Sequence, residues 1–171
     1  MASKKHLTVA YRRKREKRTD YHKRLQLLLS RKPRLVVRLS NRRIIAQIVE
    51  YQPHGDIVLA GMDSESCLKT RGWDSSYKNT PAAYALGLLL GKKAVAKGCP
   101  EAVLDTGFRA GLKGGKLFAL LKGALDAGLK VPYGEGIFPP EERLWGKHLK
   151  NGGHKVLPVI MKIKNEIMEK K

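Results

Sequence analysis

The sequence predicts an α/β fold in which a mixed sheet, made of a three-stranded antiparallel meander and one crossover strand, packs against helices. Two runs rich in β-branched residues, 34–39 and 44–51, flank a short polar stretch, which is the pattern of a β-hairpin. A strongly helical segment at 82–97 follows the meander and stops at Gly98. A short apolar strand at 102–104 comes next, and a helix between two strands requires a crossover connection.

The length and the charge add a basic N-terminal arm to this fold. The 171 residues, 42% of them hydrophobic, suffice for one domain with a sizeable core and appendages. The formal net charge of +20 is unevenly distributed. Residues 1–43 hold 16 lysines and arginines against 2 acidic residues, residues 44–100 hold 6 against 5, and residues 101–171 hold 13 against 8. This concentration predicts a polyanion-binding footprint on the first quarter of the chain.

The arm itself has a composition that favours RNA. Residues 1–10 show no periodicity and are expected to be extended until they meet a partner. Residues 11–18, YRRKREKR, contain four arginines, whose planar guanidinium groups offer phosphate several donors. Tyr11 and Tyr21 bracket this run, and aromatic rings can stack on unpaired bases. A merely solubilising tail is therefore the weaker interpretation.

A helix is predicted after the arm. Thr19 can cap its first turn, and Pro33 ends it because proline has no amide hydrogen to donate. The remaining faces of this helix are basic and are expected to meet phosphate. The apolar positions follow helical spacing and predict one packed stripe: Tyr21, Leu25, Leu28 and Leu29.

The first hairpin continues the basic surface onto folded structure. A turn at 52–55 then leads into a third strand at 56–60. Residues 61–80 are expected to form a long loop or a short irregular helix. Four arginines flank the turn at 40–43 of the first hairpin: Arg34, Arg38, Arg42 and Arg43.

The second half of the chain is mainly helical. Thr80 is expected to cap the helix at 82–97 ahead of Pro81, and Gly87 and Gly91 predict close packing on the sheet rather than a membrane dimer. Whether the last helix forms only on a partner is left open. The other expected elements are a helix at about 115–127 that stops at Gly128, a turn-rich link at 132–140, and short helices near 140–149 and 156–170. The expected parts are a basic arm and helix (1–31), a mixed α/β core (32–131) and a helical C-terminal extension (132–171).

The sequence lacks the patterns of several functional classes. No apolar run approaches the ~18 residues of a membrane span, and the charged N-terminus lacks the apolar stretch of an export signal, so the cytosol is the default compartment. Cys67 and Cys99 stand alone, which favours buried thiols over a disulfide framework or a zinc site. No phosphate loop, metal spacing or cofactor motif occurs. Asp56, Asp63 and Asp105 are interpreted as turn or capping residues, so neither catalysis nor a cofactor is expected.

Three blocks of sequence resemble a known family. They are RTDYHKRLQLLLSRKPRLVVRLSNRRIIAQIVEY at 18–51, GWDSSYKNTPAAYALGLLLG at 72–91 and EAVLDTGFRAGLKGGKLFALLKGALDAGLKVPYGE at 101–135. They are similar to the archaeal-type form of the eighteenth large-subunit ribosomal protein, the family that binds 5S ribosomal RNA. The resemblance covers about residues 7–150 and implies a sheet related to the ribonuclease-H-like motif. The tail after Lys150 has no counterpart in it.

This resemblance implies a structural protein of the large ribosomal subunit, in the cytoplasm, that attaches 5S ribosomal RNA to the large-subunit RNA in the central protuberance. The implied partners are these two RNAs and the neighbouring ribosomal proteins, with no membrane and no small-molecule substrate. The candidate RNA-binding residues of the arm and helix are Tyr11, Arg12, Arg13, Lys14, Arg15, Arg18, Tyr21, His22 and Arg24. Those of the hairpin are Arg34, Arg38, Ser40, Asn41, Arg42 and Arg43, and those of two later loops are Trp73, Lys78, Lys113 and Lys116.

Two alternatives stay open at this point. A generic nucleic-acid-binding or compacting protein would carry the same charge, and it would bind DNA and RNA alike. A nuclease on the related scaffold would need carboxylates that converge on metal ions. Asp105 is the residue whose substitution would test the nuclease.

Overall fold

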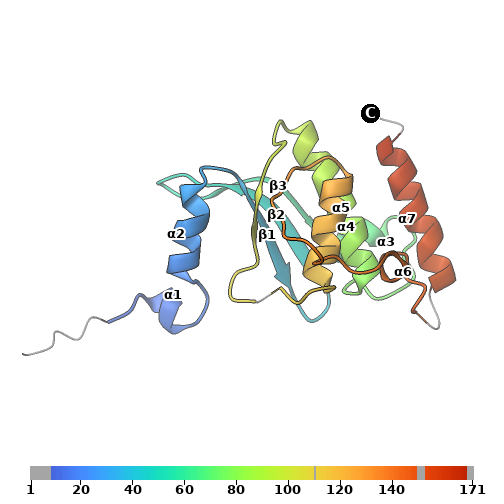
Figure 1. Ribbon diagram of the computed structural model, residues 1–171, viewed down its shortest axis with the longest axis horizontal. Coiled ribbons are helices and arrows are strands. Elements are labelled where there is room, and N and C mark those ends of the chain that lie inside the picture. The colour runs from blue at the N-terminus through green and yellow to red at the C-terminus, as the bar shows by residue number, and fades with distance from the viewer. Residues whose placement is uncertain (1–8, 110, 150–152, 169–171) are drawn as a thin grey trace, which may run out of the picture.

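The sheet has four strands in the order β3-β2-β1-β4, and Figure 1 shows it between α2 and the remaining helices. The structure, a computed structural model, describes residues 9–109, 111–149 and 153–168. β1 pairs antiparallel with β2, β2 pairs antiparallel with β3, and β4 joins β1 in parallel. The predicted mixed sheet with a crossover strand is therefore confirmed. The strands are β1 (Arg34–Leu39), β2 (Ile44–Glu50), β3 (Ile57–Asp63) and β4 (Val103–Asp105).

Side chains alternate across the central strands. Leu35 and Val37 of β1 lie opposite Ile48 and Ala46 of β2, and all four are buried. Their period of two places the apolar side chains on the face that meets the helices and turns the intervening residues of β1 to the other face. β-Branched side chains suit such a half-buried pleated surface, which explains why these runs form strands.

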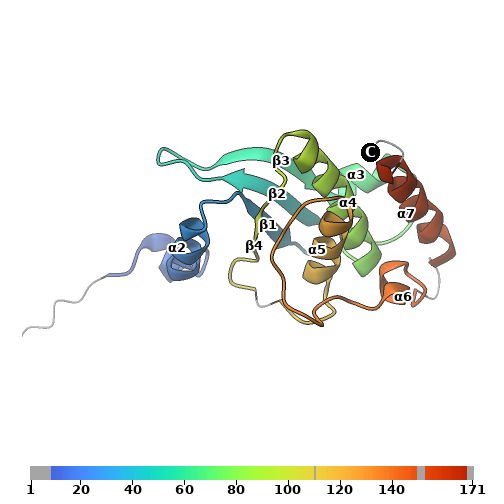
Figure 2. The same cartoon turned by 45° about the horizontal axis from the view of Figure 1, so that its top comes forward.

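Two helices, α4 and α5, form the main layer over the sheet (Figure 2). α4 (Thr80–Ala96) is buried continuously from Thr80 to Gly91, so apolar residues occupy nearly all of its faces there. Its cap is Asn79, whose Oδ1 accepts from the Ala82 amide at 2.8 Å, and the prediction of Thr80 as the cap is wrong. Gly98 adopts a φ of 77° just after the helix, as its predicted role as a stop requires. The shorter helices here are α3 (Ser64–Lys69) and α5 (Lys116–Asp126).

The glycines of α4 meet another helix. A Cβ at Gly87 would collide with the carbonyl oxygen of Leu120, and one at Gly123 of α5 would collide with that of Tyr84. A Cβ at Gly91 would lie 2.9 Å from the carbonyl oxygen of Ala124. The predicted close approach is present, but its partner is α5 and the sheet is the wrong partner. The two backbones can approach this closely only because neither side presents a Cβ.

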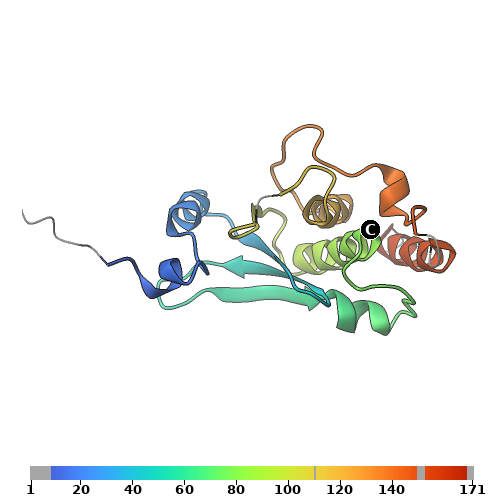
Figure 3. The same ribbon diagram turned by 90° about the horizontal axis from the view of Figure 1, so that it is seen from below.

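The C-terminal helices pack within the chain. α6 (Glu141–Leu144) is a single turn, shorter than predicted. α7 (Gly153–Met168) lies beside α4 (Figure 3) and buries Val156, Ile160 and Ile163, so its partner is the core of the same chain. No helix within the described ranges is long and apolar enough to cross a membrane.

The N-terminal helices are α1 (Arg12–Arg15) and α2 (Tyr21–Leu29). The α2 cap is Asp20, which accepts from the amides of His22 and Lys23, and not Thr19. The helix ends four residues before Pro33 because Arg31 takes a left-handed backbone with a φ of 54°. The predicted packed stripe is also wrong, since Leu25 is 60% exposed and Leu29 is 73% exposed. The expectation of an extended segment at 1–10 falls mostly on residues 1–8, outside the described residues.

Candidate nucleic-acid interface

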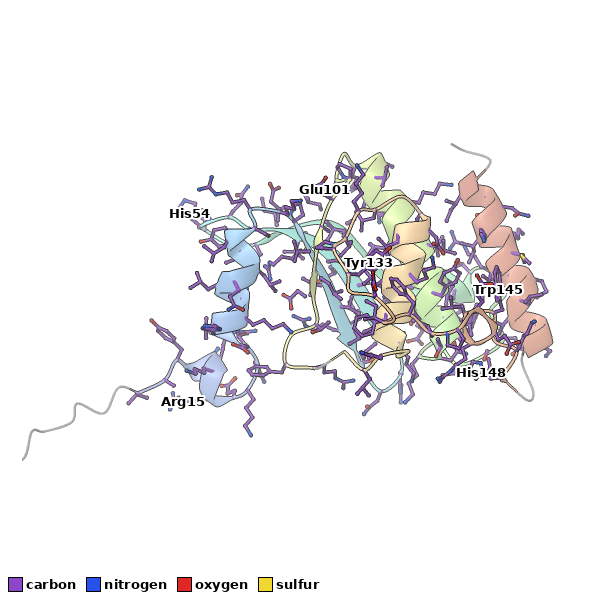
Figure 4. The ribbon with its side chains drawn as sticks, viewed as in Figure 1. Arg15, His54, Glu101, Tyr133, Trp145 and His148 are labelled. Atoms are coloured by element: carbon purple, nitrogen blue, oxygen red, sulfur yellow. The ribbon has the colours of Figure 1, made fainter. Side chains whose placement is uncertain are left out.

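α1 presents a dense group of exposed cations. All four of its residues, Arg12–Arg15, are exposed, and Arg15 lies at the edge of the molecule in Figure 4. The rings of Tyr11 and Tyr21 lie 5.3 Å apart and are tilted by 55°, so the two helices meet through an aromatic pair. Tyr11 is 74% exposed and has a free ring face for a base.

Few carboxylates compete for these cations. Glu16 pairs with Arg12 at 3.7 Å and with Arg18 at 3.2 Å, and both arginines are mostly exposed. Such surface pairs contribute at most about 1 kcal/mol and yield readily to phosphate. Arg13 donates through Nε to the neutral hydroxyl of Thr19 at 2.9 Å. Thr19 therefore closes the turn between α1 and α2 instead of capping α2.

Polar contacts hold α2 against the sheet. The ammonium of Lys23 donates to Thr106 Oγ1 and to the carbonyl of Gly107, both at 3.0 Å. Arg24 donates to both carboxylate oxygens of Asp56, which directly precedes β3, at 2.9 Å. α2 buries none of its residues completely, so charge and hydrogen bonding position it more than apolar packing does. Arg24 is thus an anchor of the helix, with its guanidinium shared between Asp56 and solvent.

Arg34 is the centre of a buried charge network. Its two terminal nitrogens donate to Asp105 at 2.9 Å and to Asp56 at 2.6 Å, and its side chain is only 4% exposed. Arg38 joins the network at 3.3 Å from Asp105 and keeps 48% of its side chain exposed. Arg34 therefore has no surface with which to meet RNA, and this predicted contact residue holds the scaffold together instead.

Asp105 stays ionised within this network. Burial alone would raise its pKa, but the amide hydrogen bond from Gly107 and the charges of Arg38 and Arg34 outweigh burial and lower the pKa below its ordinary value. Asp105 does accept the turn hydrogen bond of a capping residue, at 2.8 Å from the Gly107 nitrogen. The interpretation of Asp105 as only a turn residue is wrong, because its other contacts are buried ion pairs. Asp56 is likewise an ion-pair partner of Arg34 and Arg24.

The β1–β2 turn presents the second exposed basic group. Ser40 Oγ accepts from the Arg43 amide at 3.0 Å and donates to the Arg43 carbonyl at 2.7 Å, so Ser40 shapes the turn. Asn41 and Arg42 project from it and are exposed. Arg43 is half-exposed, and its carboxylate neighbours, Asp63 at 3.9 Å and Glu65 at 4.0 Å, are distant. This turn, α1 and the loop after β4 lie along the lower edge of the molecule in Figure 1.

The two later loops differ in what they expose. Trp73 is 5% exposed and belongs to the core, with its ring nitrogen 3.4 Å from the Ser76 carbonyl oxygen, so it cannot stack on a base as predicted. Lys78 and Lys113 are exposed. Lys116 lies half-buried in a groove of about 390 Å³ between the loop after β4 and the starts of α4 and α5. The other groove cations are Arg109 and Arg143, and the groove includes three apolar side chains, Leu39, Leu112 and Leu117.

Sequence reasoning did not select Lys23, Arg109 and Arg143 as individual site residues. Lys23 stands in the same basic run as its selected neighbours, so charge alone could have found it. The position of Arg143 beside Lys116 depends on the fold of the segment after α5, for which the sequence carries no signal. Cys67 and Cys99 are free and only partly buried, and among the described residues no group of three or more His, Cys, Asp or Glu is arranged for a metal ion.

These elements define a class of protein that binds nucleic acid through a basic arm and a hairpin turn carried by a mixed α/β core. A family model described as ribosomal large subunit proteins 60S L5 and 50S L18 matches residues 5–101. The large ribosomal subunit protein uL18 of Caldivirga maquilingensis is 50% identical over 149 residues, which cover 87% of this chain and 72% of that protein. The chain belongs to the family of the ribosomal large subunit proteins 60S L5 and 50S L18.

Membership in this family establishes a general role. The chain is an RNA-binding structural constituent of the large subunit of the cytoplasmic ribosome, and it acts in translation. Its partners are ribosomal RNA and other ribosomal proteins. The family consists of structural proteins of the ribosome and is not known for enzymes.

Proposed function

We propose that the chain binds 5S ribosomal RNA and attaches it to the large-subunit RNA in the central protuberance, beside neighbouring ribosomal proteins. The observation that carries this proposal is the pair of exposed basic groups, α1 with its tyrosines and the β1–β2 turn, along one edge of the molecule. The resemblance of three long sequence blocks to the 5S-binding family points to this particular RNA.

The contact residues form two groups in this proposal. Arg24 and Arg38 anchor the surface while keeping part of each guanidinium exposed, and Lys78, Lys113 and Lys116 extend it onto the later loops. Arg34 and Trp73 are left out because they are buried. The exposed direct contacts are Tyr11, Arg12, Arg13, Lys14, Arg15, Arg18, Tyr21, His22, Asn41, Arg42 and Arg43, with Ser40 shaping the turn.

The finer description of the fold is part of this proposal. The antiparallel meander followed by a parallel crossover strand is compatible with a ribonuclease-H-like sheet. Asp56 and Asp105 do converge, but they converge on the guanidinium of Arg34, which occupies the place that a nuclease would give to metal ions. The arm, core and C-terminal extension at 1–31, 32–131 and 132–171 remain our proposed division of the chain.

A filter-binding titration tests the proposal. Labelled 5S ribosomal RNA, an RNA duplex of unrelated sequence and a DNA duplex of the same length are titrated with the full chain at physiological salt. We expect clear preference for 5S RNA, because unpaired bases and 2′-hydroxyls contribute beyond phosphate charge. Equal affinity for all three would support the generic compacting protein and contradict the specific role.

A further inference from the structure

A small polar pocket lies between the N-terminal helices and β1. Its volume is about 130 Å³, well below the ~300 Å³ at which pockets for small organic ligands begin. Its acidic lining residues are Asp20 and Asp105. The basic lining residues number six: Arg13, Arg18, Lys23, Arg24, Arg34 and Arg38.

The acidic groups do not neutralise this pocket. Asp20 is committed to the cap of α2, where it accepts from two amides. Asp105 is shared by two arginines, and Asp56 behind it is also shared by two. The ammonium of Lys23 contacts only the neutral oxygens of Thr106 and Gly107. Cations therefore outnumber carboxylates around a space that an anion could fill.

A second observation points to a ligand. Arg34 lines the pocket and is only 3% exposed, yet its Nε has no hydrogen-bond partner among the described residues. Its other two guanidinium nitrogens are occupied by Asp56 and Asp105. A buried guanidinium N–H without an acceptor is unfavourable, and the pocket is where an acceptor would have to stand.

We propose that this pocket binds one phosphate group, which accepts from Arg34 Nε and Lys23 Nζ and locks α1 and α2 against the sheet. The inference deepens the proposed function and rests on it for the source of the phosphate, a backbone phosphate of the bound RNA. Free inorganic phosphate has the same chemistry and is the other source to be distinguished. Because α2 buries no residue completely, such a bridge would contribute strongly to its position.

Nuclear magnetic resonance can observe the pocket directly, through the Nε–H resonance of Arg34 in the ¹⁵N-labelled full chain. Inorganic phosphate is titrated at constant ionic strength against chloride, and 5S RNA is titrated in a second arm. We expect the resonance to move and saturate with RNA, with or without a response to inorganic phosphate. Lys23→Gln should weaken the phosphate response roughly tenfold, as loss of a charge-assisted hydrogen bond implies. Lys93→Gln, which changes an exposed lysine of α4, is the matched control.

The salt dependence of 5S RNA binding is a second readout that does not need the Arg34 resonance. Lys23→Gln should reduce the log–log slope by about 0.7–0.9, the value of one phosphate contact, and Lys93→Gln should leave it unchanged. Normal RNA binding with an unmoved resonance and an unchanged slope in Lys23→Gln would overturn the pocket while the proposed function stands. A response to inorganic phosphate without specific 5S binding would uphold the pocket, assign it to free phosphate, and contradict the proposed function.

Discussion

Arg34 and Asp105 connect the N-terminal helices to the strands through buried charge. Arg34 bridges Asp105, at the end of β4, and Asp56, ahead of β3, and Asp56 also accepts from Arg24 of α2. Removing one partner from such a network leaves an uncompensated charge in the interior, which costs more than the pair itself contributes. The behaviour of single residues here is therefore dominated by what remains after a substitution.

Substitution of Arg34 should be strongly destabilising. We expect Arg34→Met to lower the free energy of unfolding by about 3–5 kcal/mol, because Asp105 and Asp56 would lose their shared cation inside the protein. Arg38→Met should cost much less, since the Arg38 side chain is 48% exposed. Urea unfolding followed by circular dichroism measures both. Equal losses for the two variants would contradict the central position of Arg34.

The ionisation of Asp105 predicts a specific acid sensitivity. Its pKa lies below the ordinary value of 3.8, so the folded chain favours the carboxylate. This contribution is fully present above the ordinary pKa and is lost as the pH falls through the lower, folded pKa. Asp105→Asn should therefore be less stable at neutral pH and lose less further stability below about pH 4.

Unfolding measured between about pH 2 and pH 7 provides the check of this acid sensitivity. Asp74→Asn is the control, because Asp74 forms an exposed ion pair with Lys155. An acid dependence of Asp105→Asn identical to that of the unsubstituted chain would contradict the assignment of this sensitivity to Asp105.

At the scale of elements, the contact between α4 and α5 has the tightest constraint. Gly87 and Gly91 of α4 and Gly123 of α5 let each backbone approach the other where any Cβ would meet a carbonyl oxygen or another side chain. Contacts of this kind position α5, and with it the loop after β4 that carries Arg109 and Lys113. The helical layer thereby sets where part of the proposed interface lies.

A methyl group at this contact should force the helices apart. We expect Gly87→Ala to destabilise the chain by about 1–3 kcal/mol, as overpacking does, although alanine favours a helix by about 1 kcal/mol. Gly61→Ala in β3 is the matched control, because its Cβ would find its nearest neighbours at an ordinary 3.5 Å. Thermal unfolding compares the two variants. A Gly87→Ala variant as stable as the unsubstituted chain would show that the helices can separate freely.

At the scale of the whole molecule, charge is concentrated where few acidic groups oppose it. The chain carries +20, and residues 1–43 alone contribute +14 from 16 cations and 2 acidic residues. The exposed arginines of α1 and of the β1–β2 turn lie along one edge, so a polyanion can meet both groups at once (Figure 1). Association with RNA should consequently depend steeply on salt.

Removal of part of the arm should change that dependence by a countable amount. The triple variant Arg12→Gln, Arg13→Gln, Arg15→Gln should reduce the log–log salt slope of 5S RNA binding by about 2–3, because each lost phosphate contact contributes about 0.7–0.9. A triple variant of exposed lysines outside the arm, Lys69→Gln, Lys93→Gln, Lys130→Gln, removes the same charge. Filter binding from low to high salt measures both, and equal slopes in the two variants would mean that net charge alone directs binding.

Most of the fold could be predicted from the sequence, with errors at specific places. Strand and helix periods placed β1, β2, α4 and α5 to within a few residues, since these patterns are properties of neighbouring positions. The caps of α2 and α4 were wrong by one residue each, because several polar residues compete at each helix start. The packed stripe of α2 was wrong because hydrophobic spacing does not say whether a surface is available to cover it.

The sequence by itself determined the fold class, the family, and the segment that carries the charge, because composition, periodicity and long similar blocks are all written along the chain. Only the tertiary structure decided which basic residues are free to meet RNA. Arg34 and Arg42 look alike in sequence, yet Arg34 meets Asp105, 71 positions away, inside the protein, while Arg42 stays exposed on a turn. The physical reason is that the availability of a charge depends on partners that folding brings from distant parts of the chain, and local sequence does not specify them.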